Sequence, residues 1–305
     1  GIASMSERFN VTYRLKLFVL SLVKDMRILT ILDNIFHVLF LPFSFLSYQW
    51  HRLLGRPYHG IWLASSQGNP FRFKYMAQSI DYLAKDLEQR GRPPSSTEVR
   101  ILEIGAYAGA SAIQWGQALK KHHFKEATVY SLDPWKSYLD LKKNPRWRLR
   151  IMNHALASGR IFQLFKRNIK AAGVSAMCRQ LVGNSAEILP LLKDNSFDFI
   201  YIYGDHEAGA VKKDIKNALP LLKDGGLLCG DDLEMQLSGV DVDFVKRHLD
   251  LDMAVDPASG VAFHPGVALA VGEFFQKDVP CYEGYWVVQK KGHDFDDVKL
   301  DGGPE

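Results

Sequence analysis

The stretch VRILEIGAYAGASAI, residues 99–113, decides the fold of this chain. Its first six residues form a largely apolar run with one acid, Glu103, and a turn of small residues follows before a helical pattern begins. Such a run is typical of a strand buried on both faces of a parallel sheet, and Gly105 and Gly109 allow the backbone to approach a ligand closely. The stretch therefore predicts a strand, a ligand-binding turn and a helix.

Tyr107 argues against a dinucleotide in this turn. The dinucleotide-binding fingerprint requires glycine at the position of Tyr107, so that only a GxxxG spacing remains. The N-terminus of the following helix still favours an anionic group, and a carboxylate would serve as well as a phosphate. This stretch alone leaves an alternative open, in which the strand, turn and helix bind no ligand.

Four further strand-like runs, 128–132, 179–182, 197–203 and 227–230, alternate with helical patterns. This alternation predicts an α/β fold with a doubly wound, mainly parallel sheet. Ligands bind such sheets at the carboxyl ends of the strands. The residues at these ends are Gly105, Asp133, Ser185, Asp205 and Asp231.

Asp133 ends the second strand, 28 residues after Gly105. An acid at this position grips a ribose diol through a bidentate hydrogen bond, although a simple helix cap is the alternative. Trp135 follows two residues later and either covers an adenine face or packs in the core. These two residues extend the predicted ligand site to the second strand.

Carboxylates follow the fourth and fifth strands, at Asp205 and at the pair Asp231 and Asp232. Three acids at neighbouring strand ends repel one another unless a cation compensates, and oxygen ligands with open positions suit Mg²⁺, or Mn²⁺ in its place. Such an ion would lower the pKa of a bound hydroxyl. His206, beside Asp205, titrates near neutrality and is a candidate base, and His264 is a weaker one. The alternative is that Asp232 faces solvent and Asp231 caps a turn.

Composition limits the function classes. The 305 residues are 47% hydrophobic, enough for one large core with an appendage, and the net charge of +4 includes no long basic stripe. Nucleic acid is therefore not an expected partner. The three cysteines are far apart and have no metal-ligand spacing, which favours a reducing, cytoplasmic location.

Residues 5–60 are expected to form an N-terminal apolar helical arm, ahead of a catalytic domain at 61–305. Positions 35–48 contain no Asp, Glu, Lys or Arg, but this run is too short for a spanning helix and Pro42 interrupts it. The arm either lies on a membrane surface, which would make the protein peripheral on the inner face of the membrane, or packs against a partner subunit or the core. Without a membrane, so apolar an arm favours a homo-oligomer.

LEIGAYAGAS, residues 102–111, resembles the first motif of class I S-adenosylmethionine-dependent methyltransferases, and its GAYxGxS form is similar to the catechol O-methyltransferase type. The resemblance covers about 98–235 and implies a seven-stranded, Rossmann-like sheet. It assigns the ribose to Asp133 and the metal to Asp205, Asp231 and Asp232. The remaining cofactor-binding residues it implies, with Trp135 added from the reasoning above, are Glu103, Gly105, Ala106, Tyr107, Gly109, Ser111, Asn184 and Ser185.

One departure affects the catalytic base. Catechol-type enzymes carry a lysine three residues after the acid of the fourth strand, and this chain has Ala208 there. The sequence is closer to the metal-dependent macrocin type, in which the metal-bound acid takes the proton. This resemblance implies Asp205 as the catalytic base, with His206 as the competitor.

The predicted activity is Mg²⁺-dependent methyl transfer from S-adenosylmethionine to a hydroxyl of a sugar, a glycolipid or a small natural product. The Asp- and Gly-rich residues 236–263 are expected to form the loop that selects this acceptor. The apolar arm favours a lipid-linked or surface-glycan acceptor. Two alternatives are a nicotinamide-dependent oxidoreductase on a similar sheet and a membrane-associated binding protein with a vestigial cofactor site.

Overall fold

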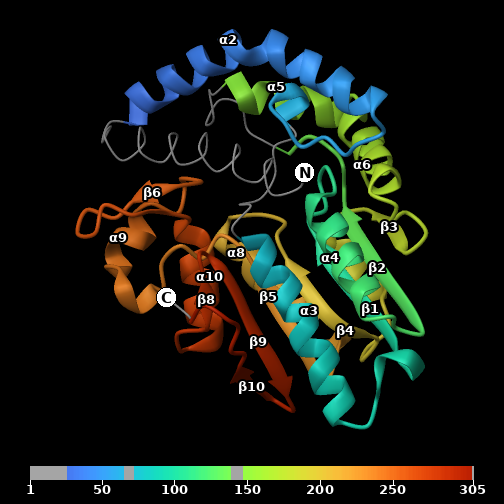
Figure 1. The fold of residues 1–305 in the computed structure, drawn as a ribbon. Helices are drawn as coiled ribbons and strands as arrows, with labels where there is room; N and C mark the ends of the chain where they lie inside the picture. Colours follow the sequence, from blue (N-terminus) through green and yellow to red (C-terminus); the bar gives the residue numbers. More distant parts are fainter. Residues whose placement is uncertain (1–25, 65–71, 139–146, 304–305) are drawn as a thin grey trace.

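A single mixed sheet forms the centre of the molecule (Figure 1). The computed structural model describes residues 26–64, 72–138 and 147–303. Within them the main path of the sheet runs β10-β9-β5-β4-β1-β2-β3, and the short β8 pairs with β9. The bounds of these strands are β1 Glu98–Ile104, β2 Glu126–Asp133, β3 Cys178–Val182, β4 Phe197–Ile202, β5 Leu222–Gly230, β8 Cys281–Tyr282, β9 Tyr285–Lys291 and β10 Asp294–Asp297.

The five predicted strands are β1 to β5, and all their pairings are parallel, as the alternation with helices predicted. The antiparallel β9 pairs with β5, and β10 returns beside β9 as an edge strand. The predicted seven strands are those of the main path. β8 makes an eighth because the chain turns back at Glu283 and Gly284, both with positive φ, and pairs Tyr282 with Tyr285.

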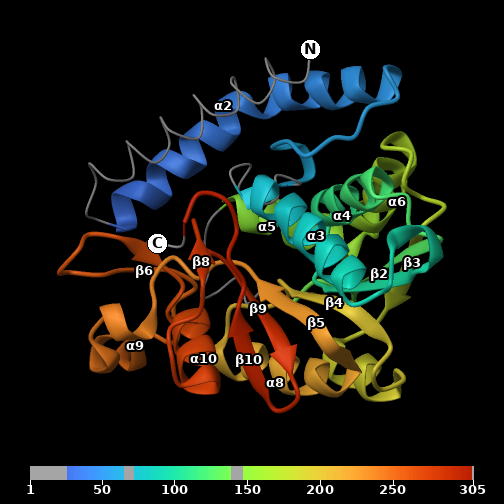
Figure 2. The same ribbon diagram turned by 60° about the horizontal axis from the view of Figure 1, so that its bottom comes forward.

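Helices cover both faces of the sheet, and Figure 2 shows α3 and α4 on one side and α8 and α10 on the other. Alternate residues of a strand point to opposite faces, so Ile101 packs in the core with α3 and α4 while Leu102 packs in the core with α8 and α10. The helices after α2 are α3 Arg72–Gln89, α4 Ala110–Lys121, α5 Trp147–Ala157, α6 Arg160–Ala171, α7 Ser185–Ile188, α8 Ala208–Ala218, α9 Val242–Arg247 and α10 Pro265–Phe275.

The described part of the arm is one helix, α2 (Met26–Leu53), which lies outside the sheet and contacts α5 (Figure 1). The prediction that Pro42 interrupts this segment is wrong for the backbone, because the helix continues through Pro42. Many large apolar side chains of α2 are exposed, among them Leu39, Phe43 and Leu46 at 62, 68 and 64%. No helix in the described residues is long and apolar enough to cross a membrane. Residues 5–25 of the arm lie outside the described residues.

The expected acceptor loop, 236–263, has structure of its own. It contains α9 and a small antiparallel pair, β6 (Ala254–Val255) with β7 (Ala262–Phe263). Asp241 caps α9 by accepting a hydrogen bond from the backbone N–H of Asp243 at 2.9 Å. This loop leads from the end of β5 to α10 and brings Asp252 and His264 to the same end of the sheet as Asp232.

Candidate active site

The loop between β1 and α4 has the tight geometry that its glycines predicted. Gly105 has φ +94°, and a Cβ on it would overlap the carbonyl oxygen of Tyr203 at the end of β4. Gly109 has φ +86° and caps α4, where a Cβ would lie 2.9 Å from the ring of Phe165. Both glycines are required by close packing, since side chains disfavour positive φ and there is no space for a methyl group. Ala106 between them is fully buried.

Asp133 braces this loop. Its carboxylate accepts hydrogen bonds from the backbone N–H of Tyr107 at 2.9 Å and from that of Trp135 at 2.6 Å. The indole N–H of Trp135 in turn donates to the carbonyl of Tyr107 at 2.7 Å. Burial raises the pKa of Asp133, and the backbone N–H groups oppose this rise. Three predicted cofactor-binding residues therefore form one hydrogen-bonded unit at the ends of β1 and β2.

The ring of Trp135 lies in the core rather than on the surface of the site. It is 5% exposed and packs against Phe162 and Phe165 of α6, with ring centroids 4.5 and 5.0 Å away. This is the packing alternative that the sequence left open for Trp135. The hydroxyl of Tyr107 donates to the carbonyl of Ala64 at 3.0 Å and so ties the loop to the segment after the arm.

Glu103 and Ser111 lie beneath the loop. Glu103 is fully buried, and its carboxylate accepts a hydrogen bond from Ser131 of β2 at 2.6 Å. Burial raises the pKa of Glu103 to about 7, although the Ser111 and Ser131 hydroxyls oppose this rise. Ser111 is 5% exposed. Both residues support the loop from inside the protein.

Asn184 and Ser185 follow β3 and begin α7. The Asn184 side chain caps α7 by accepting the backbone N–H of Ala186 at 2.9 Å. Ser185 donates to Asp214 of α8 at 2.6 Å, and burial raises the pKa of Asp214 to about 6. The backbone N–H of Gly183 donates to the carbonyl of Asp133 at 3.2 Å, so this end of β3 adjoins the braced loop.

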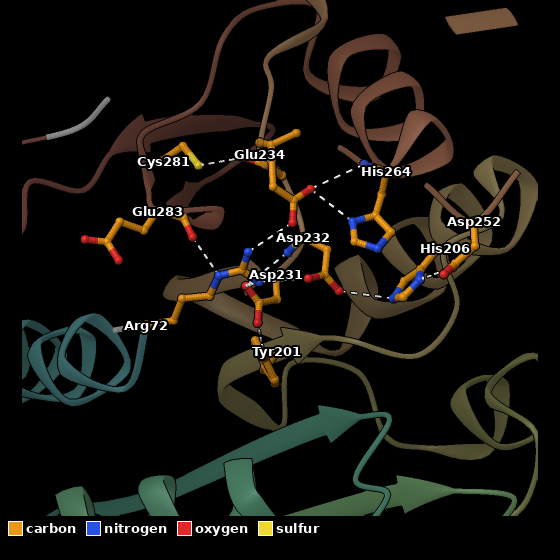
Figure 3. Close-up of polar contacts among 11 residues, drawn as sticks. Arg72, Tyr201, His206, Asp231, Asp232, Glu234, Asp252, His264, Cys281 and Glu283 are labelled. Carbon is orange, nitrogen blue, oxygen red and sulfur yellow. Dashed lines mark hydrogen bonds and ion pairs between the residues drawn. The ribbon is translucent and has the colours of Figure 1, made fainter. Parts of the chain in front are cut away.

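The acid pair at the end of β5 contacts a buried arginine (Figure 3). Asp231 and Asp232 both accept hydrogen bonds from Nη1 of Arg72, the bond to Asp232 being 2.7 Å long. Nη2 of Arg72 donates to Glu234 at 3.0 Å. Asp231 also accepts a bond from the hydroxyl of Tyr201 at 3.3 Å. The positive charge next to Asp231 and Asp232 in this structure is therefore a side chain of α3.

Two histidines complete this cluster. His206 lies between Asp232, 3.1 Å from Nε2, and Asp252, 2.7 Å from Nδ1. Burial disfavours the imidazolium, but the hydrogen bonds with both carboxylates outweigh it and raise the pKa of His206 well above its usual value. His264 lies with its ring centroid 4.4 Å from that of His206, and its Nδ1 is 3.0 Å from Glu234. Bonding to Glu234 likewise outweighs burial and raises the pKa of His264.

Asp232 shares its carboxylate between Arg72 and His206. Burial disfavours its charged form, but the bond from His206 and the positive charges nearby hold the pKa of Asp232 well below its usual range. Asp232 is only 8% exposed, so the alternative that it faces solvent is wrong. It is the residue through which the arginine and the histidine are connected.

Asp205 stands apart from the pair. It is exposed, and its carboxylate accepts the backbone N–H of Glu207 at 2.9 Å. Among the described residues, two groups bring potential ligand atoms within 4.8 Å of one another: His206, Asp252 and His264, and Asp232, Glu234 and His264. The predicted metal trio Asp205, Asp231 and Asp232 is not one of them.

A small cavity connects the predicted residues at the ends of β4 and β5. Asp205, His206, Asp231 and Asp232 all line it. The other lining residues are Ile202, Tyr203, Val211, Val267 and Trp286. The polar residues therefore face an apolar wall made by β4, α8, α10 and β9.

Sequence reasoning missed Arg72, Glu234 and Asp252 as members of this cluster. Glu234 lies two residues beyond the acid pair, so its proximity was available from spacing alone. Arg72 and Asp252 come from α3 and from the expected acceptor loop, and no local pattern marks either residue. His264 was singled out only as a weak candidate, and it is one of the two central histidines.

Residues 102–233 match a family model described as a methyltransferase domain. The chain is similar in structure to the O-methyltransferase NovP, with a TM-score of 0.51 at 16% identity over 74% of this chain and 84% of that one. It also resembles TomG from Streptomyces achromogenes, with a TM-score of 0.39 at 16% identity over 70% of this chain and 90% of that one. PaMTH1 from Podospora anserina is similar with a TM-score of 0.40 at 17% identity over 74% of this chain and 90% of that one. No curated protein matches the chain.

Residues 102–233 therefore form a methyltransferase domain, and the fold agrees with the class I S-adenosylmethionine-dependent type that the first motif predicted. The domain match supports a methyl-transferring enzyme.

Proposed function

We propose that this protein transfers the methyl group of S-adenosylmethionine to a hydroxyl of a sugar, a glycolipid or a small natural product. The observation that carries the proposal is that the braced loop after β1 and the acid and histidine cluster after β4 and β5 lie at the same edge of the sheet. Ligands of doubly wound sheets bind at that edge. The cofactor supplies an electrophilic methyl group on a sulfonium.

The residues after β1, β2 and β3 fit such a cofactor. Gly105 and Gly109 leave the loop without side chains at two positions, and the N-terminus of α4 favours the carboxylate of an amino acid. Asp133 accepts backbone hydrogen bonds from Ala106, Tyr107 and Trp135, and a carboxylate has about four acceptor positions, so it retains capacity for a ribose. Asn184 and Ser185 would border the adenine. Tyr107 takes the place of a pyrophosphate-binding glycine.

On the acceptor side, Asp205 is the better candidate for the base. It is exposed, and within the described residues its carboxylate accepts one hydrogen bond, from the backbone N–H of Glu207. His206 has both ring nitrogens engaged with carboxylates and a raised pKa, so it holds its proton and is poorly suited to accept another. We assign proton abstraction to Asp205 and the orientation of Asp232 to His206.

The predicted Mg²⁺ does not fit the acid pair as it is arranged. Both Asp231 and Asp232 accept hydrogen bonds from the guanidinium of Arg72, and among the described residues the ligand atoms of Asp205 do not lie within 4.8 Å of theirs. Mg²⁺ prefers nearly octahedral oxygen ligation and would need these same oxygens. We therefore derive no step of the reaction through a metal ion.

Two properties of the molecule bear on the acceptor and the partners. The exposed apolar face of α2 supports a lipid-linked or surface-glycan acceptor, with the protein peripheral on a membrane. The same face would serve self-association where no membrane is present. All three cysteines are buried thiols, which supports a reducing compartment.

Calorimetry and a transfer assay test the proposal. The full-length protein should bind S-adenosylmethionine and not NAD, and should transfer a labelled methyl group to at least one member of a panel of sugars, glycolipids and phenols. Asp205→Asn should reduce transfer by about a hundredfold with cofactor binding retained, because general base catalysis contributes roughly that much. Binding of NAD alone would support the oxidoreductase. Cofactor binding without transfer to any acceptor would support a binding protein.

A further inference from the structure

Arg72 is held in the acid cluster by every nitrogen of its guanidinium. Nη1 donates to Asp231 and Asp232, Nη2 donates to Glu234 at 3.0 Å, and Nε donates to the carbonyl of Glu283 at 2.6 Å. The residue is 6% exposed. A guanidinium with this number of partners, three of them carboxylates, is fixed in place and remains charged at any pH at which the protein is folded.

The turn between β8 and β9 has a shape that admits this side chain. Glu283 and Gly284 both have positive φ, +54° and +88°, and this conformation directs the Glu283 carbonyl to Arg72. A Cβ on Gly284 would lie 2.5 Å from Nη2 of Arg72. The position of the arginine is therefore specified from two sides, by the acids at the end of β5 and by a turn that only glycine allows.

Figure 3 shows that Arg72 points between the side chains of Asp231, Asp232 and Glu234. This is the place where three neighbouring carboxylates require a compensating cation. A divalent ion bound to Asp231 and Asp232 would have to share their oxygens with a permanent positive charge a few ångströms away. Like charges at such a distance repel strongly in a buried site.

We propose that Arg72 is the resident cation of this site, in place of a divalent metal ion, and that it is a positioning residue for Asp232. Arg72 holds the carboxylate of Asp232 in place, so that its other oxygen lies 3.1 Å from Nε2 of His206. The enzyme thus obtains the charge compensation of its acid pair from α3, outside the matched methyltransferase domain. The role of Arg72 in methyl transfer rests on the proposed function. Its pairing with Asp231 and Asp232 in place of a metal ion does not depend on that function.

Binding of Mn²⁺ to the full-length protein tests this proposal, by isothermal titration with the metal alone. The two ligand groups that contain His264 do not include Asp231, so the diagnostic quantity is Mn²⁺ binding that depends on Asp231. We expect the wild type and Asp231→Asn to bind Mn²⁺ with equal affinity, because the Asp231 carboxylate is already paired with the guanidinium of Arg72. Loss of a Mn²⁺ site in Asp231→Asn would overturn the proposal, and this comparison requires no substitution of Arg72.

Arg72→Met should create a Mn²⁺ site at least about tenfold tighter than any weak binding in the wild type, because the repelling charge is gone. The double variant Arg72→Met with Asp231→Asn should lose that site, and Arg72→Lys, which keeps the charge, should not gain it. Arg92→Met, an exposed arginine elsewhere, is the matched control. Failure of a folded Arg72→Met variant to gain a site would contradict the claim that Arg72 keeps the ion out.

These measurements need neither cofactor nor acceptor, so their outcome is independent of the proposed function. We further expect EDTA to leave methyl transfer by the wild type unchanged. Transfer that EDTA abolishes and Mg²⁺ restores would overturn the role of Arg72 while leaving the methyltransferase activity established. Absence of any transfer would affect only the proposed function.

Discussion

Asp133 links the end of β2 to the loop after β1 by accepting a hydrogen bond from the backbone N–H of Tyr107, and it also accepts the backbone N–H of Trp135 in its own turn. Hydrogen bonds to a charged group contribute about 1.5–3 kcal/mol each, so the carboxylate has a structural task as well as its predicted contact with the ribose. The sequence presented these as alternatives, a cap or a ligand. In the fold the backbone bonds leave acceptor capacity on the same carboxylate for the predicted contact.

Asp133→Asn should lower the affinity for S-adenosylmethionine by about tenfold or more, because one charged acceptor is lost and the loop loosens. Isothermal titration calorimetry measures this affinity, and Asp194→Asn, at an exposed acid, is the control. Equal affinities of Asp133→Asn and the wild type would exclude Asp133 from cofactor binding.

Glu103 predicts a pH dependence of stability. Its pKa is about 7 in the fold against 4.5 as the reference value, because burial disfavours the charge. The folded state therefore binds this proton more tightly than the unfolded state, and its contribution to stability is greatest below pH 4.5 and is lost as the pH rises through 7. The full loss is about 3 kcal/mol, at roughly 1.36 kcal/mol per pKa unit.

Glu103→Gln should remove this dependence, since the amide mimics the neutral acid. Urea unfolding of both proteins at pH 5.5 and pH 8 measures it. Relative to the wild type, the free energy of unfolding of the variant should rise by about 2 kcal/mol from the lower to the higher pH, because part of the loss has already occurred at pH 5.5. An unchanged difference between the two proteins across this range would show that Glu103 is charged in the fold throughout.

At the scale of elements, the approach of α10 to the loop after β4 sets the geometry of the acceptor side. Gly266 lies in the first turn of α10, and a Cβ on it would overlap the carbonyl oxygen of His206. His264 precedes the same helix and faces His206. The close contact of these two segments therefore places both histidines.

Gly266→Ala should destabilise the protein by about 1–3 kcal/mol, the usual cost of overpacking, and should reduce methyl transfer by shifting Asp205 and His206. Gly209→Ala is the matched control, because nothing lies within 4 Å of its added Cβ. Thermal unfolding and the transfer assay compare the two variants. If Gly266→Ala behaves like Gly209→Ala in both assays, the contact does not determine the site.

At the scale of the whole molecule, the arm and the sheet differ in how much apolar surface they expose to solvent. The sheet is covered on both faces, whereas α2 exposes Leu39, Phe43 and Leu46 at i, i+4 and i+7 on one side of the helix. An apolar stripe of this kind marks a surface that another body covers, and we propose a membrane surface.

Substitution of Leu39, Phe43 and Leu46 by serine in the full chain should abolish flotation with vesicles that contain anionic lipids, while the wild type floats. Leu191→Ser, at an exposed leucine far along the chain, should float as the wild type does. Equal flotation of the triple variant and the wild type would rule out this anchor. A wild type that does not float but sediments as an oligomer would assign the stripe to self-association.

The sequence by itself determined the five parallel strands, the helices between them and the loop after β1. These features follow from local patterns: apolar runs, turn residues and alternation, each confined to a few neighbouring positions. The same patterns placed Asp133, Asp205, Asp231 and Asp232 at strand ends, because parallel strands bring their carboxyl ends to one edge.

Only the tertiary structure decided what these acids contact. Arg72 is 159 positions from Asp231 and 162 from Glu234, and Asp252 is 46 from His206. Contacts over such separations depend on how α3, α10 and the loop before it pack on the sheet, and no local periodicity encodes them. The sequence could therefore predict that the acid pair needs a cation, but the fold supplied that cation as an arginine from a helix outside the matched domain.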